Sequence, residues 1–456
     1  MVKVVSLELN ELDFALLQGY ARDGSLPTFQ RLMSTHDLVP TTAETDATHL
    51  EPWIQWITAH TGLTFAQHGV FRLGDIVDTE LPQVWEILEE RFGLRVGAIS
   101  PMNAQNRLRH PAFFVPDPWT RTPTTGTWDL KLLGAAVAQA VNDNAHGRIT
   151  FGSYCRLAAG ALVNVGAANL PTYVKLAASS RTRKWRKALL LDLLLGDAFI
   201  RQWQRTKPDY ASLFLNAAAH IQHHYMFSSR HYTGPLANPS WYVEHSVDPV
   251  GEAYAIYDRI LHNFLTRLPD VRLLLCTGLG QQPNVSVIHY YRPKHHGALL
   301  QALGVSDVVG IEPRMSRDFL VVLASDAAAR AAQLQLESFR APDGSGVFSA
   351  ENRGRTLFCM LTYTSLIEAP FSIRGSGCVV SEFETMVSHV SIENAVHRSE
   401  GYFLDTGLPR SGSTTAMPLE DVFVHTLGIW DTVRETVAHA RAAPECWPLL
   451  GPAKPC

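Results

Sequence analysis

Three histidines stand where they could bind a metal ion. His220 and His224 lie four residues apart, directly after the apolar run Tyr210–Leu215, which reads as a buried strand. His397 lies much further along the chain, where another short strand pattern begins. Ligands at strand ends can converge from distant parts of an α/β chain. We therefore expect these three imidazoles to form one metal site.

An alternative must stand beside that hypothesis, because the chain has nineteen histidines and a pair at this spacing can arise by chance. Adjacent histidines such as His295 and His296 show that pairs are not rare here. His223 lies between the two proposed ligands in sequence. It is expected to be solvated, or to contact the ligands without binding the metal itself. The position directly after a strand favours the metal hypothesis.

The composition is that of an ordinary globular enzyme. The chain has 456 residues, of which 46% are hydrophobic and 18% charged, and its net charge is −4. That charge gives no reason to expect affinity for nucleic acid or anionic lipid. The basic stretch 181–187 precedes an apolar helical pattern that could touch a membrane surface or a partner, although a helix covering the core is favoured.

Neither targeting nor membrane insertion is expected from the sequence. The six cysteines are scattered without a C-x-x-C pair, which favours a reducing, cytoplasmic compartment. The first residues enter a strand pattern without the features of a signal peptide. Apolar runs fall short of the roughly 20 residues that span a bilayer.

Strand and helix patterns alternate along much of the chain and predict an α/β fold with a largely parallel sheet. Val4–Leu9 and Arg95–Ser100 read as strands, and Asp13–Met33 reads as one helix. A helix-rich block and a small α+β cap interrupt this pattern. The expected organisation is core (1–127), helical insertion (128–206), core (207–292), α+β cap (293–384) and core (385–456).

The order of these segments resembles the alkaline phosphatase superfamily, in particular its type I phosphodiesterase and nucleotide pyrophosphatase branch. The residues that carry the resemblance begin with VVSLELNELDFALL and DGSLPTFQRLM, continue with Thr61-Gly62 followed by His68-Gly69, and end with HRSEGYFLDTG. The resemblance implies an alkaline-phosphatase-like core, with a parallel sheet flanked by helices, and metal-dependent hydrolysis of phosphate esters. It also places the branch's metal motif on His220 and His224, and its last metal histidine on His397.

The departures from that pattern change the expected site. Asn10 stands where the branch has an aspartate after the first strand, and Gly278-Leu279 stands where it has Asp-His. Most of a second metal site would thereby be lost. Three imidazoles still suffice for one zinc ion, with a fourth position for water or substrate. We therefore expect one zinc per chain, and the sequence leaves room for a second divalent ion.

The sequence identifies the nucleophile or general base less clearly than the metal ligands. The branch places a threonine or serine nucleophile shortly before Thr61-Gly62, but an ungapped count reaches Pro52, which cannot serve. Thr48 is a substitute if a few residues are inserted. Glu51, beside two tryptophans, is the preferred candidate and would act as a general base. Cations and amides near the metal would recognise the anionic ester, and the candidates are Asn10, Arg72 and Arg398.

The leading hypothesis is a cytoplasmic, phosphodiesterase-like hydrolase of small anionic phosphate esters. A transferase or lyase acting on an activated anionic metabolite would keep the fold but change the reaction. A non-catalytic binding protein on the same scaffold is the third possibility. No nucleic-acid partner is expected, and the oligomeric state is open.

Overall fold

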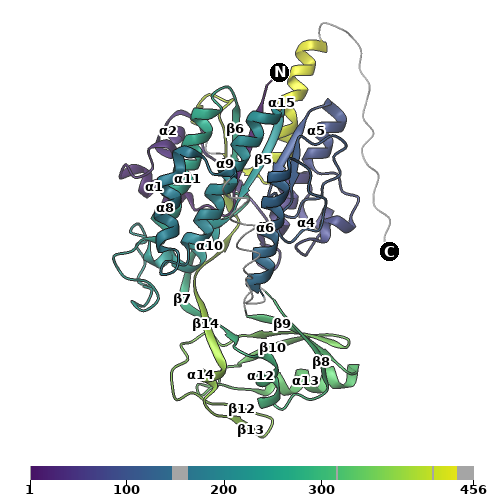
Figure 1. The fold of residues 1–456 in the computed structure, drawn as a ribbon, viewed down its shortest axis with the longest axis vertical. Coiled ribbons are helices and arrows are strands. Elements are labelled where there is room, and N and C mark those ends of the chain that lie inside the picture. Colours follow the sequence, from purple (N-terminus) through teal and green to yellow (C-terminus); the bar gives the residue numbers. More distant parts are fainter. Residues whose placement is uncertain (1, 146–162, 315–316, 413–414, 439–456) are drawn as a thin grey trace.

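The computed structural model describes residues 2–145, 163–314, 317–412 and 415–438. Figure 1 shows a large body, in which helices flank a central sheet, and a smaller body below it. Two long strands, β7 (Gly280–Pro293) and β14 (Val387–Arg398), join the two bodies as an antiparallel ribbon.

The central sheet has eight strands in the order β16-β2-β15-β6-β1-β5-β3-β4. Strand β1 (Val4–Leu9) is parallel to both of its neighbours, β5 and β6, and every residue of β1 and β5 is buried. Burial on both faces explains why these strands are nearly continuous apolar runs. The predicted α/β class with a largely parallel sheet is confirmed. The remaining bounds are β2 (Val39–Thr42), β3 (Val96–Ile99), β4 (Phe113–Val115), β5 (Tyr210–Leu215), β6 (Arg272–Cys276), β15 (Glu400–Asp405) and β16 (Met417–Pro418).

Helices cover the two faces of this sheet with separate apolar cores. One core contains side chains of α1 (Phe14–Arg22), α2 (Pro27–Thr35) and α11 (Pro249–Arg267). The other contains side chains of α3 (Pro52–Thr61), α5 (Val84–Phe92) and α15 (Asp421–Ala438).

The single helix predicted over Asp13–Met33 is wrong. Two helices lie there, and the break falls where Gly24 adopts a positive φ of 82° and Pro27 begins α2. Proline lacks the N–H that a continuing helix would need, but it suits the first turn of a new one.

The helix-rich block packs tightly on the core. Its described helices are α6 (Trp128–Ala145), α8 (Leu170–Ser179) and α9 (Arg186–Thr206). Asp192 of α9 accepts hydrogen bonds from the backbone N–H of Ala217 and the hydroxyl of Tyr257, each at 2.7 Å. Ala217 is the first residue of α10 (Ala217–Tyr225), so the block supports the start of that helix. No described helix is long and apolar enough to cross a membrane.

The smaller body has the α+β character that the sequence predicts. Its antiparallel sheet has the order β10-β11-β9-β8, and α13 (Asp326–Ser338) packs against it. The bounds of these strands are β8 (Val308–Pro313), β9 (Asp318–Leu323), β10 (Phe348–Arg353) and β11 (Thr356–Leu361). The boundaries predicted for the core, the helical insertion and the α+β cap stay predictions.

The ribbon between the two bodies was not foreseen. A short strand was expected to open at His397, whereas that residue lies next to the end of β14. The pairing of β14 with β7 shifts register twice, between His389 and Ser391 and between Glu393 and Ala395. Such irregularities interrupt the alternation of apolar and polar residues by which a strand is recognised in sequence.

Asp405, the last residue of β15, is held by an arginine and a histidine. Its carboxylate accepts a hydrogen bond from Arg272 Nε at 2.7 Å and lies 2.6 Å from His425 Nε2. Burial alone would raise the pKa of Asp405, but hydrogen bonds from His425 and Arg272 lower the pKa to about 2. A carboxylate with a lowered folded-state pKa contributes stability above its unfolded pKa and loses it as the pH falls.

We predict that Asp405→Asn lowers the free energy of unfolding by about 3 kcal/mol at neutral pH, since Arg272 loses its charged partner. The difference between the variant and the wild type should shrink as the pH falls from about 4 to about 2, because the wild-type carboxylate becomes protonated in that range. Urea denaturation at a series of pH values measures both effects. A difference that stays constant down to about pH 2 would contradict the role given to the ionised carboxylate.

Candidate metal centre

Glu11 lies just beyond the carboxyl end of β1 in a strained backbone conformation. Its φ is +53°, and its N–H donates a hydrogen bond to the carbonyl of Thr277 at 3.0 Å. A residue other than glycine loses about 1–2 kcal/mol in the left-handed region. Strain of this kind is concentrated at functional sites, and the carboxyl edge of a parallel sheet is where α/β proteins bind ligands.

Two histidines converge on one oxygen of the Glu11 carboxylate. His223 Nε2 lies 2.9 Å and His397 Nε2 lies 3.2 Å from Glu11 Oε2. Gln281 Nε2 donates a hydrogen bond to the same oxygen at 2.6 Å, and Gln281 pairs with His397 across the ribbon. Helix α10 and both strands of the ribbon thus bring side chains to the end of β1.

The outer ring nitrogens of the two histidines also face acceptors. His223 Nδ1 lies 2.9 Å from the carbonyl oxygen of Ala395, so Nδ1 must carry the proton of that hydrogen bond. In a neutral imidazole, Nε2 then carries only a lone pair. This lone pair would face the Glu11 carboxylate, and neither a proton nor a cation would lie between the two. Either a second proton or a bound cation is required there. His397 Nδ1 lies 3.7 Å from Glu51 Oε2, which is an ion-pair distance and too long for a hydrogen bond.

The charges of this cluster stabilise one another. Burial would raise the pKa of Glu11, but His397 and His223 hold it well below its usual value. Burial would lower the pKa of His397, but Glu11 and then Glu51 raise it to about 9. In the absence of a metal the cluster is therefore an ionised carboxylate beside a protonated His397.

The donor set fits a divalent metal such as zinc. Within the described ranges, Glu11, His223 and His397 form the group of three ligating side chains whose donor atoms all lie within 4.8 Å of one another. Ligands at zinc–ligand distances of 2.0–2.1 Å in a tetrahedral site would lie roughly 3.3 Å apart, close to the 2.9 and 3.2 Å observed. A backbone carbonyl on the far nitrogen of a histidine, as at His223, is the usual way in which such a ligand is oriented.

The three-histidine set expected from the sequence is not brought together. His220 is exposed, and its ring lies against that of His224 at 4.8 Å. His224 Nδ1 lies 2.9 Å from the carbonyl oxygen of Ile392. Because a helix turns by about 100° per residue, His223 faces Glu11 while its neighbour His224 points elsewhere. His223, expected to be solvated or to support the ligands, is instead the histidine that lies beside His397 at the Glu11 carboxylate.

Asn10 is buried, and its side-chain amide forms hydrogen bonds within the protein. Its amide nitrogen donates to Glu11 Oε1 at 2.7 Å and to Asn216 Oδ1 at 2.8 Å, and its oxygen accepts from Trp56 Nε1 at 2.7 Å. The Trp56 ring also closes the space beside Gly278, where an added Cβ would lie 3.0 Å from the indole. The amide therefore fixes the Glu11 carboxylate from the side opposite the two histidines.

The two candidates for the chemical step are placed differently. Glu51 precedes α3 without a side-chain capping bond, and its side chain is 33% exposed beside His397. Burial raises the pKa of Glu51, and the charge of His397 opposes that rise. Thr48 is exposed, and its hydroxyl donates to Asp46 Oδ1 at 2.8 Å. Its hydroxyl is therefore engaged within its own turn.

The two arginines assigned to substrate binding have other neighbours. Arg398 Nη2 lies 3.6 Å from Asp13 Oδ1 and 3.5 Å from Glu400 Oε1. Arg72 is exposed, and its charge contributes to the lowered pKa of Glu351 on β10 of the smaller body. Neither arginine is among the contacts of Glu11, and their role toward a substrate stays a prediction.

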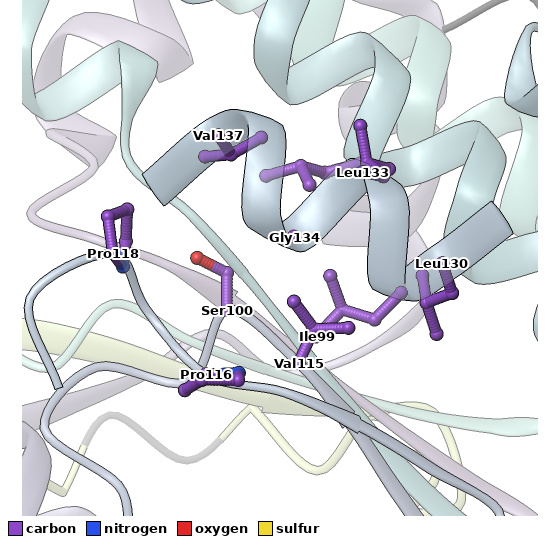
Figure 2. Close-up of a pocket in the computed structure, with 10 residues that line it drawn as sticks. Ile99, Ser100, Val115, Pro116, Pro118, Leu130, Leu133, Gly134 and Val137 are labelled. Atoms are coloured by element: carbon purple, nitrogen blue, oxygen red, sulfur yellow. The ribbon is translucent and has the colours of Figure 1, made fainter. Parts of the chain in front are cut away.

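A cavity lies apart from this centre, beneath α6 and next to the ends of β3 and β4 (Figure 2). Its volume is about 20 Å³, and Ser100 is the one polar side chain in its lining. A space of that size holds one or two water molecules. The cavity is therefore too small and too apolar to be the site of an anionic substrate.

We predict that His223→Ala lowers zinc affinity at least about 100-fold, because a direct ligand matters more than the supporting residues whose loss costs about 10–100-fold. His220→Ala is the matched control on the same helix and should leave the affinity within about threefold of wild type. Elemental analysis after gentle purification and competition with a chelator of known affinity measure both variants. Loss of zinc in His220→Ala, with His223→Ala unaffected, would restore the three-histidine hypothesis.

Comparison with known proteins gives structural similarities at low sequence identity. No family model matches the chain, and no curated protein sequence matches it. Phosphonoacetate hydrolase from Sinorhizobium meliloti 1021, in complex with phosphonoformate, is 14% identical over 93% of this chain and 94% of its own, with a TM-score of 0.40. Murine ectonucleotide pyrophosphatase / phosphodiesterase 5 is 11% identical over 94% and 95%, with a TM-score of 0.42. Wild-type alkaline phosphatase PafA is 14% identical over 92% and 94%, with a TM-score of 0.40.

Proposed function

We propose that this protein is a metal-dependent hydrolase of small anionic phosphate esters, most suited to diesters, with one zinc ion held by Glu11, His223 and His397. The observation that carries the proposal is the convergence of two imidazole Nε2 atoms on Glu11 Oε2, at 2.9 and 3.2 Å. The outer nitrogen of His223 is already committed to a carbonyl. A cation at the centre satisfies all three side chains at once.

Zinc bound there would supply Lewis acidity toward a phosphoryl oxygen and lower the pKa of a coordinated water. The chain's own residues orient the donors. Asn10 donates to Glu11 Oε1 and Gln281 donates to Oε2, so both carboxylate oxygens are held. Three protein ligands leave a fourth coordination position, as in catalytic zinc sites.

Glu51 is the residue that we assign to proton transfer. Its carboxylate lies on the far side of His397 from Glu11, is not used as a helix cap and is partly open to solvent. Burial raises its pKa toward the range in which a carboxylate accepts a proton efficiently near neutral pH. Glu51 would take a proton from the attacking water as it approaches phosphorus.

Direct attack by water is favoured over a covalent intermediate. Thr48 Oγ1 is bonded to Asp46 in an exposed turn, and Pro52 occupies the first position of α3. A nucleophile needs a helix N-terminus or an effective adjacent base to activate its hydroxyl. Thr48 precedes α3 by several residues, and its neighbour Asp46 is a weak base because hydrogen bonds from the backbone and side chain of Thr48 lower the pKa of that carboxylate. The same arrangement gives no specific support to a transferase, which would need a nucleophile or a second substrate site.

We predict that the zinc-loaded protein hydrolyses bis-p-nitrophenyl phosphate and that Glu51→Gln lowers kcat about 100-fold, which is the lower end of the effect of a general base. The variant is assayed at saturating zinc, because Glu51 lies beside His397 Nδ1 and loss of such a supporting carboxylate costs about 10–100-fold in metal affinity. Under that condition its zinc content should equal that of the wild type. Thr48→Ala is the matched control from the same segment and should keep the wild-type rate. Steady-state kinetics with parallel elemental analysis separate loss of chemistry from loss of metal.

Three outcomes would overturn parts of this proposal. A zinc-loaded protein that hydrolyses neither diesters nor monoesters would exclude the hydrolase and move the assignment to a transferase or lyase. A Thr48→Ala variant as inactive as Glu51→Gln would restore the covalent route. Full activity and full metal content in Glu11→Gln would show that the metal lies elsewhere.

A further inference from the structure

Helix α8 presents apolar side chains to solvent. Leu170 is 55% exposed and Val174 is 61% exposed, one helical turn apart, whereas Leu176 on the opposite side is buried against the core. Single exposed apolar residues are common on protein surfaces. Two of them on one face of a short helix leave an apolar stripe that no described residue covers.

The segment around this helix carries only positive charge. From residue 163 to residue 191 the sequence contains no aspartate or glutamate, and it contains six basic residues. Arg183 and Arg186 form ion pairs with Glu252 of α11. The other four basic side chains are exposed and have no carboxylate partner among the described residues, namely Lys175, Arg181, Lys184 and Lys187.

The turn that carries these charges is anchored to the body. Trp185 Nε1 donates to Glu252 Oε2 at 2.9 Å, and Arg186 Nε donates to the same oxygen at 2.9 Å. The carboxylate therefore holds the buried side chains of Trp185 and Arg186, whereas Lys184 and Lys187 beside them are exposed. Lys184 also lies close enough to His389 of β14 for its charge to lower the pKa of that histidine, to which burial contributes most. Less conformational freedom is then lost when these lysines meet a partner.

We propose that the basic-apolar patch, formed by Leu170, Val174, Lys175, Arg181, Lys184 and Lys187, docks this protein on an anionic lipid bilayer. Cations near such a surface are attracted by its negative potential, and apolar side chains between them enter the boundary of headgroups and acyl chains. A nucleic acid would use the charges but would leave Leu170 and Val174 against water. This proposal is independent of the proposed hydrolase.

The charge distribution explains why net charge gives no hint of this surface. The whole chain carries −4, so overall attraction to an anionic surface is not expected. A surface potential acts only within about one Debye length, roughly 8–10 Å. Binding therefore depends on the local patch, whose four exposed cations come from a segment that contains no aspartate or glutamate.

The test is cosedimentation of the full-length protein with phosphatidylcholine vesicles, with and without phosphatidylserine, at low salt. We expect binding only to the vesicles that contain phosphatidylserine. The double variant Lys184→Glu with Lys187→Glu should weaken binding at least about tenfold, because each basic residue near the surface contributes appreciably. Leu170→Ser with Val174→Ser should also weaken it severalfold. The control pair is Val309→Ser with Leu334→Ser, which removes side chains 66% and 71% exposed on the smaller body.

Several results would overturn the proposal. Absence of binding to phosphatidylserine vesicles, or binding that survives both patch variants, would exclude this surface. Binding that is lost with the lysines but unchanged in Leu170→Ser with Val174→Ser would indicate a general polyanion site, which competition with duplex DNA would identify. A concentration-dependent dimer abolished by the serine pair would make a second copy the occupant. Diester hydrolysis by the patch variants, measured in the same preparations, reports on the catalytic proposal separately.

Discussion

The structure around the candidate centre depends on one buried carboxylate. Glu11 leaves the end of β1 with a strained backbone, and its two oxygens accept from Asn10, Gln281 and the two histidines. An ionised carboxylate out of contact with water is tolerated only when charge and hydrogen bonds compensate for its lost hydration. The helix, the ribbon and the central strand each supply part of that compensation. Their positions are therefore tied to the ionisation of a single side chain.

The fold could be predicted largely from local patterns. Apolar runs such as Tyr210–Leu215 and Val4–Leu9 marked strands buried on both faces, and the helical block and α+β cap differed visibly in composition. The ribbon was missed because its two register shifts disturb the period of two on which strand recognition depends. The helix over Asp13–Met33 was overextended because its pattern of apolar residues continues across Pro27.

The site was harder to predict than the fold, because it depends on the direction in which each side chain leaves its helix or strand. His397 was proposed as a ligand and lies in the Glu11 cluster. The choice among His220, His223 and His224 depends on where α10 begins, because an error of one residue rotates the helix by about 100°. Glu11 was not predicted, because the family pattern places its metal ligand at the position of Asn10, one residue earlier in the chain. The sequence did contain one indication of Glu11, namely a carboxylate two residues after a predicted buried strand. Gln281 gave no signal, because its role comes from pairing with His397 across the ribbon.

The ribbon has a mechanical consequence. His397 and Gln281 sit at the body end of two strands whose other ends belong to the smaller unit, so torque applied to that unit is carried along continuous backbone toward the two side chains that contact Glu11. The ladder is weakest at its two register shifts, where cross-strand hydrogen bonds are interrupted. We therefore expect the ribbon to bend at these two shifts before it bends at His397 and Gln281.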